Sequence, residues 1–501
     1  MKIRKYIYLL LFIAGLAAAA QSADVGSILQ RREAATKLPD SDSAVLYHGT
    51  TFTIFDDGRM NREEHVVRYL RTVNAWDDYG DPLLAYDSLR QDLEITLSRT
   101  HTLDGRQVDT TPNGFNQITP FGLDLAPDLT HYHQVVVTHL GIEADATTEL
   151  KYIIRDKEPL LPWAWADLVL GSHEPILERV VVVVVPEKLK LQFLESNQAP
   201  KAQKEVHDGV ETYTWRMSDL AAVRFAENEV YTGKFLPRIS FTTCPGWDKF
   251  TAVLQERLSK AALQDKAFTE AINAFKGISD AKVLLDSVST FISNRIALKR
   301  FPDLGMLASF RPLDRIYHSG YASSADLALL YTSALKTLGF NPEVSLFSEG
   351  IMPLPGLIGD EKYVIRLTLD NNILWLFPAD GSVQYRTPEN VVMIGVMPTR
   401  FPALFPASPL QENQLQTDLE VTVAEDYKAT GWIVLKTQGA FSRYETATEK
   451  APEALLEEWI ADSFSDLEIK DARYLSLNPN YVEIRANLSF AMQPDSADSI
   501  L

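Results

Sequence analysis

The stretch from Gly320 to Gly339, GYASSADLALLYTSALKTLG, places hydroxyl and carboxyl side chains at the start of an apolar segment. Ser324 and Asp326 stand where the spacing of apolar residues predicts that a helix begins. Unpaired N–H groups and the macrodipole at a helix N-terminus stabilise negative charge. A serine hydroxyl is too weak an acid to ionise by this effect alone. A nucleophilic Ser324 would therefore need a base within hydrogen-bond reach, oriented by a third group.

Candidate partners for Ser324 lie on two strands expected further along the chain. The first strand begins with Lys362 and Tyr363, and Phe377 directly follows the second. Tyrosine is a poor base near neutral pH, whereas Lys362 could serve in a Ser-Lys pair if burial removed its charge. Phe377 has no polar side-chain atom and would fill a polar pocket with apolar surface.

This arrangement resembles the bacterial transglutaminase-like proteins of the papain-like cysteine protease superfamily. Their pattern reads roughly Gly-Tyr-Gly-Asp-Cys-x-Asp-x-Ala-x-Leu-Leu, followed by a strand that opens with His and a strand that ends Trp-Leu-Asp-Pro. Counting back from Gly339, the resemblance puts Ser324 at the Cys position, Tyr363 at the His position and Phe377 at the Asp position. A register slip of one residue would put Lys362 at the His position. The resemblance implies a transglutaminase-like fold without its catalytic triad.

Two interpretations of Ser324 remain open. In the first, Ser323 and Ser324 are helix caps whose oxygens accept backbone N–H groups, and Asp326 supports the cap. In the second, Ser324 attacks amides or esters, helped by Lys362 or by a group from another domain. We favour the caps and expect no catalytic residue at Ser324, Tyr363 or Phe377.

Other titratable residues give weaker signals. His318 lies six residues before Ser324 and is expected on a surface loop. Cys244 is the one cysteine, so no intrachain disulfide can form, and we expect a partly buried residue without a catalytic role. Tyr321 and Trp375 are expected to pack the core around the former catalytic positions.

Three histidines form the most metal-like set, His131, His133 and His139. On one continuous strand they would share a face, because side chains alternate. His131 and His139 would then be ~26 Å apart at ~3.3 Å per residue, too far for one ion without a chain reversal. We expect no metal site. The sequence also contains no Gly-rich phosphate loop, CxxC pair, HExxH or GxSxG motif, so no cofactor is expected.

The net charge of the protein disfavours one class of binding partner. The 501 residues include 48 Lys and Arg against 67 Asp and Glu, a formal net charge of −19, without a basic stripe. Nucleic acid is therefore not an expected partner.

The first residues of the chain have the order of a signal peptide. Basic residues at positions 2, 4 and 5 precede the apolar run Ile7–Leu16 and small residues at 17–20, which predicts a signal peptide over residues 1–22. We expect a secreted or periplasmic protein without a transmembrane anchor.

The first half of the chain has strand-like patterns. Residues 23–43 are polar and are expected to form a loose leader. Asp56-Asp57-Gly58 and Leu103-Asp104-Gly105 each predict a hairpin turn. The six valines Val180–Val185 cannot alternate, so their strand is predicted to be central or buried on both faces. Residues 44–240 are predicted to form an antiparallel β-sandwich, which resembles the uncharacterised β domain that often precedes transglutaminase-like cores in bacterial envelope proteins.

In the second half of the chain, the spacing of apolar residues changes from strand-like to helical. Helices are predicted at Trp247–Ala262, Lys266–Phe275 and Asp280–Ala297, and strands at Pro342–Phe347, Lys362–Leu369 and Ile373–Leu376. These elements predict an α+β transglutaminase-like core over residues 245–400. A proline cluster predicts a linker at 401–414. Residues 415–501 predict a C-terminal β-rich domain with the order strand, strand, helix, strand. Whether that domain is complete stays open.

Three functions follow as hypotheses. The first is a non-catalytic transglutaminase-like protein that binds a protein or glycan partner in the cell envelope. The second is an amide or ester hydrolase, or an acyl transferase, with Ser324 as the nucleophile. The third is a structural envelope module.

Overall fold

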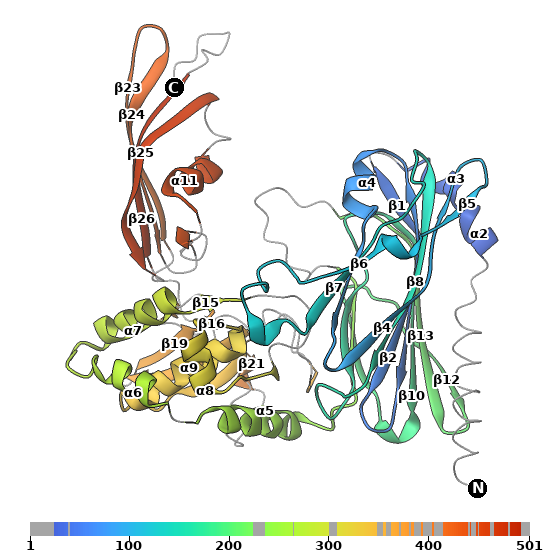
Figure 1. Cartoon of the computed structure of the whole chain (residues 1–501), viewed down its shortest axis with the longest axis horizontal. Coiled ribbons are helices and arrows are strands. Elements are labelled where there is room, and N and C mark those ends of the chain that lie inside the picture. Colours follow the sequence, from blue (N-terminus) through green and yellow to red (C-terminus); the bar gives the residue numbers. More distant parts are fainter. Residues whose placement is uncertain are drawn as a thin grey trace. The chain divides into compact units, whose positions relative to one another are not determined.

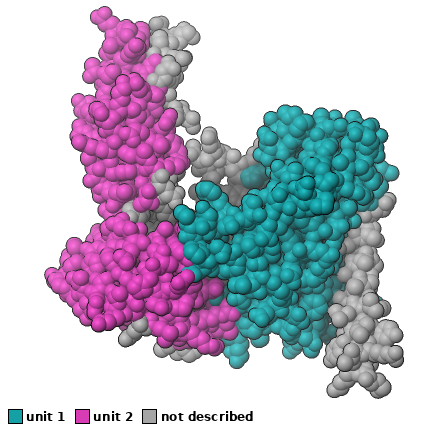
Figure 2. Space-filling model, viewed as in Figure 1, with its two compact units in different colours: residues 1–250, 301–308, 351–359 teal, residues 251–300, 309–350, 360–501 magenta. Residues whose placement is uncertain are grey.

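The computed structural model describes the chain in segments, and element labels follow Figure 1. The described residues are 25–38, 41–223, 236–263, 265–299, 308–347, 354–356, 362–369, 372–379, 382–384, 392–393, 403–404, 414–438, 441, 447–448, 450–460, 465–478 and 481–491. The predicted signal peptide lies outside them, as does most of the predicted linker. Figure 2 shows two compact units: unit 1 comprises residues 1–250, 301–308 and 351–359, and unit 2 comprises residues 251–300, 309–350 and 360–501.

An eight-stranded sheet is the centre of unit 1, with the strand order β12-β13-β10-β1-β2-β8-β4-β5. Its strands are β1 (Ser43–Ile54), β2 (Met60–Leu70), β4 (Gln91–His101), β5 (Gln107–Asp109), β8 (Ala146–Asp156), β10 (Ile176–Pro186), β12 (Gln203–His207) and β13 (Val210–Leu220). Both Asp-Gly hairpins are confirmed, since β1 pairs with β2 and β4 with β5, and Gly58 and Gly105 adopt φ of +86° and +87°. Positive φ is the conformation that glycine allows at such turns.

The strand that contains the six valines is central in the sheet, as predicted. All six residues Val180–Val185 are buried, and β10 pairs on both sides, with β1 and β13. One expectation is wrong, however, because β10 runs parallel to β1 and the sheet is mixed rather than antiparallel. The two strands are separated by more than a hundred residues, so no hairpin turn dictated their direction.

Two smaller sheets complete unit 1. The first has the order β11-β14-β9 and the second β3-β7-β6. Their strands are β3 (Leu83–Asp87), β6 (Phe115–Ile118), β7 (Tyr132–Val137), β9 (Trp165–Val169), β11 (Gln192–Ser196) and β14 (Arg238–Thr242). Alternate valines of β10 pack in one core with Trp215, Ile239 and Phe241, so the β11-β14-β9 sheet covers one face of the large sheet.

The predicted loose leader is partly helical and docked. It forms α2 (Val25–Leu29) and α3 (Arg32–Ala35), and Ile28 is fully buried in a core with residues of β1 and β2. The Arg32 guanidinium donates to the carbonyl oxygen of His101 at 2.7 Å and to the Thr147 hydroxyl at 2.6 Å. These long-range contacts, invisible in a polar sequence, order the segment. A further helix, α4 (Asn74–Tyr79), follows β2.

After unit 1's sheets the chain forms helices followed by a further sheet. Three helices occur where predicted, with ends shifted by one or two residues: α5 (Trp247–Ala261), α6 (Lys266–Asn273) and α7 (Ala281–Arg295). Next come β15 (Ala297–Leu298), α8 (Leu313–Ser319), β16 (Tyr321–Ala322) and α9 (Ser324–Thr337). The sheet β17-β18-β19-β20 follows, made of β17 (Glu343–Phe347), β18 (Lys362–Leu369), β19 (Asn372–Phe377) and β20 (Ser382–Gln384). A short pair, β21 (Val392–Met393) and β22 (Ala403–Leu404), completes the described strands before residue 414.

The last segment forms a four-stranded sheet with one helix. The sheet has the order β23-β24-β26-β25. Its elements are β23 (Gln414–Val423), β24 (Lys428–Gln438), α11 (Pro452–Ile460), β25 (Ser465–Asn478) and β26 (Tyr481–Ala491). The expected order omitted β25. No helix in the described part of the chain is both long and apolar enough to cross a bilayer.

Candidate active site

The N-terminus of α9 is closed by a reciprocal cap. The Ser323 hydroxyl accepts the backbone N–H of Asp326 at 3.1 Å, and the Asp326 carboxylate accepts the backbone N–H of Ser323 at 3.2 Å. This capping box satisfies two of the N–H groups that a helix start leaves unpaired. Ser323 is therefore the cap, and Ser324 is the first helical residue rather than a second cap.

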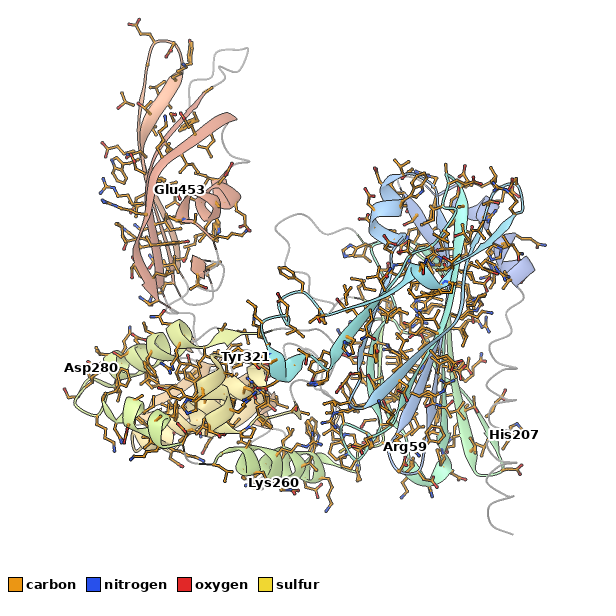
Figure 3. The ribbon with its side chains drawn as sticks, viewed as in Figure 1. Arg59, His207, Lys260, Asp280, Tyr321 and Glu453 are labelled. Carbon is orange, nitrogen blue, oxygen red and sulfur yellow. The ribbon has the colours of Figure 1, made fainter. Side chains whose placement is uncertain are left out.

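Asp326 is committed to a second partner as well. The Arg311 side chain donates from Nε to the Asp326 carboxylate at 2.7 Å, and the Arg311 backbone N–H donates to the same carboxylate at 2.8 Å. Arg311 also donates to the carbonyl oxygen of Tyr321 at 2.5 Å and lies 4.4 Å from the centre of its ring. Figure 3 labels Tyr321 beside the helices of this core. These bonds from Arg311 fix the conformation of the turn before α9, so the Asp326 carboxylate has a structural role.

Ser324 itself has no base in the described structure. Its side chain is half-buried, and among the described residues no hydrogen bond to its hydroxyl occurs. His318 lies on α8 rather than on the expected loop, is exposed, and its Nε2 is 3.3 Å from Asp265. The prediction that His318 is exposed is thus confirmed, but the prediction that it lies in a loop is wrong.

The positions that the resemblance assigns to His and Asp are filled by buried aromatic rings. Tyr363 on β18 is 4% exposed, and its ring meets Phe310 edge-on with centroids 5.7 Å apart. Phe377 ends β19 and is 7% exposed, while Trp375 in the same strand is fully buried. Such apolar surroundings disfavour a charged imidazolium. Lys362 opens β18 opposite Phe347, and its side chain lies outside the described residues.

The structure brings these positions into one neighbourhood. Helix α9 packs against β18, and Phe310, which contacts Tyr363, directly precedes Arg311 in the chain. Ile365 pairs with Leu376, so Tyr363 and Phe377 lie at the same end of the β18–β19 pair. The role of Arg311 was not predicted from the sequence. The Ser-x-x-Asp spacing of the capping box was a usable signal for the role of Asp326.

The three histidines considered as metal ligands have separate environments. His131 Nε2 is 3.9 Å from Asp87, the His133 ring packs on Tyr86, and His139 Nδ1 lies 3.4 Å from the Ser98 hydroxyl. Over the described residues, no group of three His, Cys, Asp or Glu side chains could hold a metal ion.

Cys244 is fully buried rather than partly buried. Burial raises the pKa of its thiol to about 11, so almost none of it is thiolate at neutral pH. Its burial and raised pKa are those of an unreactive core thiol.

Comparison with known proteins gives a domain family and a fold. Residues 56–224 match the family described as a domain of unknown function with a solved structure, DUF3857. No curated protein matches the chain. The crystal structure of "a putative protease from Parabacteroides distasonis" superposes with a TM-score of 0.64 at 17% identity, covering 90% of this chain and 94% of that chain.

Two further solved structures align far less well, and their TM-scores are too low to indicate a shared fold. An aminopeptidase A from Legionella pneumophila, in complex with aspartic acid, has a TM-score of 0.23 at 7% identity over 41% of this chain and 22% of its own. An M1 zinc metallopeptidase from Deinococcus radiodurans has a TM-score of 0.21 at 10% identity over 40% of this chain and 42% of its own. The chain therefore matches the DUF3857 family over residues 56–224 and shares its fold with the Parabacteroides distasonis protein.

Proposed function

We propose that this chain is a secreted or periplasmic transglutaminase-like protein that has lost cysteine catalysis and binds a protein or glycan partner of the cell envelope. In this proposal residues 1–22 are a cleaved signal peptide, residues 245–400 are the transglutaminase-like core, and residues 44–240 and 415–501 are the flanking β domains. The observation that carries the proposal is the set of side chains at the three catalytic positions, a serine and two buried aromatic rings.

Physical chemistry favours the loss of catalysis over a change of nucleophile. A serine needs a base and an orienting group, because its hydroxyl does not ionise at a helix N-terminus. The nearby carboxylate, Asp326, is 1% exposed and already bound by Arg311. Rings at Tyr363 and Phe377 add apolar surface where a charged relay would need polar partners.

A fluorophosphonate probe tests this proposal directly. The native full-length chain should remain unlabelled, as should Ser324→Ala and the matched control Ser333→Ala, which alters a half-buried serine further along α9. Amine-incorporation and esterase assays on the same samples should stay at background. Labelling of the native chain that disappears in Ser324→Ala and persists in Ser333→Ala would overturn the proposal in favour of a serine hydrolase or acyl transferase.

A further inference from the structure

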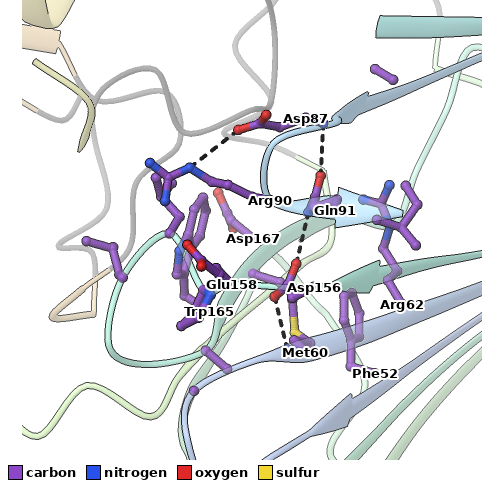
Figure 4. Close-up of a pocket in the computed structure, with 18 of the residues that line it drawn as sticks. Phe52, Met60, Arg62, Asp87, Arg90, Gln91, Asp156, Glu158, Trp165 and Asp167 are labelled. Carbon is purple, nitrogen blue, oxygen red and sulfur yellow. Dashed lines mark hydrogen bonds and ion pairs between the residues drawn. The ribbon is translucent and has the colours of Figure 1, made fainter. Parts of the chain in front are cut away.

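A cleft of about 390 Å³ lies on the large sheet of unit 1 (Figure 4). Phe52 lines it from β1, Met60 from β2, and Tyr152 and Asp156 from β8, and these three strands are neighbours in the sheet. Gln91, the first residue of β4, and Trp165, the first residue of β9, line it from two other directions. Its volume falls in the lower part of the ~300–1,000 Å³ range of small-molecule sites.

Among the described residues, four carboxylates line the cleft, and two of them are paired with arginine: Asp87 with Arg90 and Asp167 with Arg238. The other two are Asp156 and Glu158. The half-buried Asp156 accepts hydrogen bonds from the Gln91 side chain and from the Met60 backbone N–H, both at 3.0 Å. Both donors are neutral, and burial raises the pKa of the Asp156 carboxyl. Glu158 lines the same cleft and is exposed. This part of the cleft can accept further hydrogen bonds from a ligand.

Guanidinium groups occupy other parts of the same cleft. Arg90 lies 3.4 Å from Asp87, and Figure 4 shows this pair next to Gln91. Arg62 Nε is 3.8 Å from Glu64 and stands on the side of the cleft away from Glu158. The lining therefore offers donors and acceptors together. An amine ligand brings donors only, and a phosphate would face the carboxylates of Asp156 and Glu158, so neither matches the whole lining.

Aromatic rings supply the apolar part of the lining. Trp165 and Tyr152 are half-buried, and Phe52 is fully buried in the sheet. Flat rings combined with a few polar groups are the usual composition of a site for a compact ligand that is apolar on its faces and polar at its edge. A sugar ring has C–H faces and hydroxyl edges, and each hydroxyl both donates and accepts.

We propose that this cleft binds a neutral saccharide unit, one or two rings in size, through Trp165, Asp156 and Glu158. The proposal rests on the binding role given above and chooses a glycan rather than a protein as the partner. Mixed charge in the lining favours a neutral ligand, and the rings favour one with apolar faces.

The test uses the full-length chain and isothermal titration calorimetry with maltose, cellobiose, lactose and N,N′-diacetylchitobiose, and with the cationic peptide Gly-Arg-Gly. At least one disaccharide should bind the native chain. Its affinity should fall at least tenfold in Trp165→Ala and in Asp156→Asn, and at least threefold in Glu158→Gln, whose exposed position keeps folding intact. Matched controls outside the cleft, Trp247→Ala and the exposed Glu205→Gln, should keep native affinity.

Three results would overturn the saccharide assignment. They are no binding of any of the four disaccharides, disaccharide binding that survives all three cleft variants, and Gly-Arg-Gly binding that the cleft variants abolish. The fluorophosphonate result is independent of the cleft. A failed sugar titration leaves the non-catalytic proposal standing, whereas labelling at Ser324 leaves the cleft assignment standing.

Discussion

Unit 1 and unit 2 each bury a carboxylate almost completely but compensate its charge with different partners. Asp326 at the start of α9 and Glu149 on β8 are both 1% exposed. Asp326 is bound by the guanidinium of Arg311, which remains charged throughout the accessible pH range. Glu149 is bound by His65 and His101 at 3.1 and 2.9 Å, and histidine charge changes near neutral pH. The comparison teaches that equal burial gives unequal sensitivity to acid.

Burial and hydrogen bonding oppose each other in the histidine cluster. Burial by itself would raise the pKa of Glu149, but hydrogen bonds from His101 and His65 hold that pKa well below its usual range. Burial lowers the pKa of His65, and its bond to Glu149 offsets this only in part. Both effects stabilise unit 1 near neutral pH. Both are lost as the pH falls, because the unfolded chain then binds more protons than the folded one.

Removing Arg311 should have the largest effect on stability. Arg311→Met leaves the Asp326 carboxylate buried without its cation, which should cost roughly 3–5 kcal/mol of unfolding free energy. The matched control is Arg366→Met, which removes the partner of the half-exposed Glu343 on the adjacent strand and should cost about 1 kcal/mol or less. Urea denaturation of both variants measures the difference. Equal losses would show that the α9 start is not held by a buried ion pair.

Acid should destabilise unit 1 by a smaller amount. Burial lowers the pKa of His139 to about 4, against 6.5 in an unfolded chain. Its stabilising contribution is therefore complete above about pH 6.5 and decreases as the pH falls toward 4, by roughly 2–3 kcal/mol at about 1.4 kcal/mol per pH unit. Urea denaturation at pH 7.5 and 4.5, followed by tryptophan fluorescence, measures this loss.

Substitution identifies the group responsible for the pH effect. His139→Gln should reduce the pH dependence to the part that His65 and Glu149 contribute, whereas His207→Gln, at the exposed position labelled in Figure 3, should leave it unchanged. A pH dependence that is identical in all three proteins would contradict the assignment to His139.

Changes at the N-terminal cap of α9 should have the smallest effect on stability, and they should distinguish Ser323 from Ser324. Ser323→Ala removes the side-chain acceptor for the Asp326 N–H and should cost about 1 kcal/mol. Ser324→Ala changes the first helical residue and should stay within about 0.5 kcal/mol of the native chain. Thermal and urea unfolding of the two variants give the comparison. A larger loss for Ser324→Ala would move the cap by one residue and weaken the assignment of Ser324 to the cysteine position.

The C-terminal sheet shows why some elements could not be predicted from the sequence. Strand β25 was missed, and its pairing with β26 shifts register between Ser465 and Glu468, between Lys470 and Arg473, and between Tyr474 and Ser476. Asp471 within it has a φ of +51°. Such bulges interrupt the alternation of buried and exposed side chains on which strand prediction depends.

Local chemistry in the sequence determined the turns, the helices and the central valine strand. Asp-Gly turns, helical spacing and six buried valines act within a few residues, so the chain alone specifies them. The same holds for the start of α9, where Ser323 and Asp326 are three residues apart. The sequence also showed that cysteine was absent from the position where the family resemblance expects a nucleophile.

Tertiary structure decided everything that joins distant segments. Strand β1 accepts β10 in parallel, Arg32 anchors the leader to β4, and Arg311 neutralises Asp326. The cleft likewise depends on Trp165 and Gln91 meeting at the large sheet. These contacts depend on which surfaces pack together and on the free energy of burying them, and neither quantity is encoded in the spacing of residues along one segment.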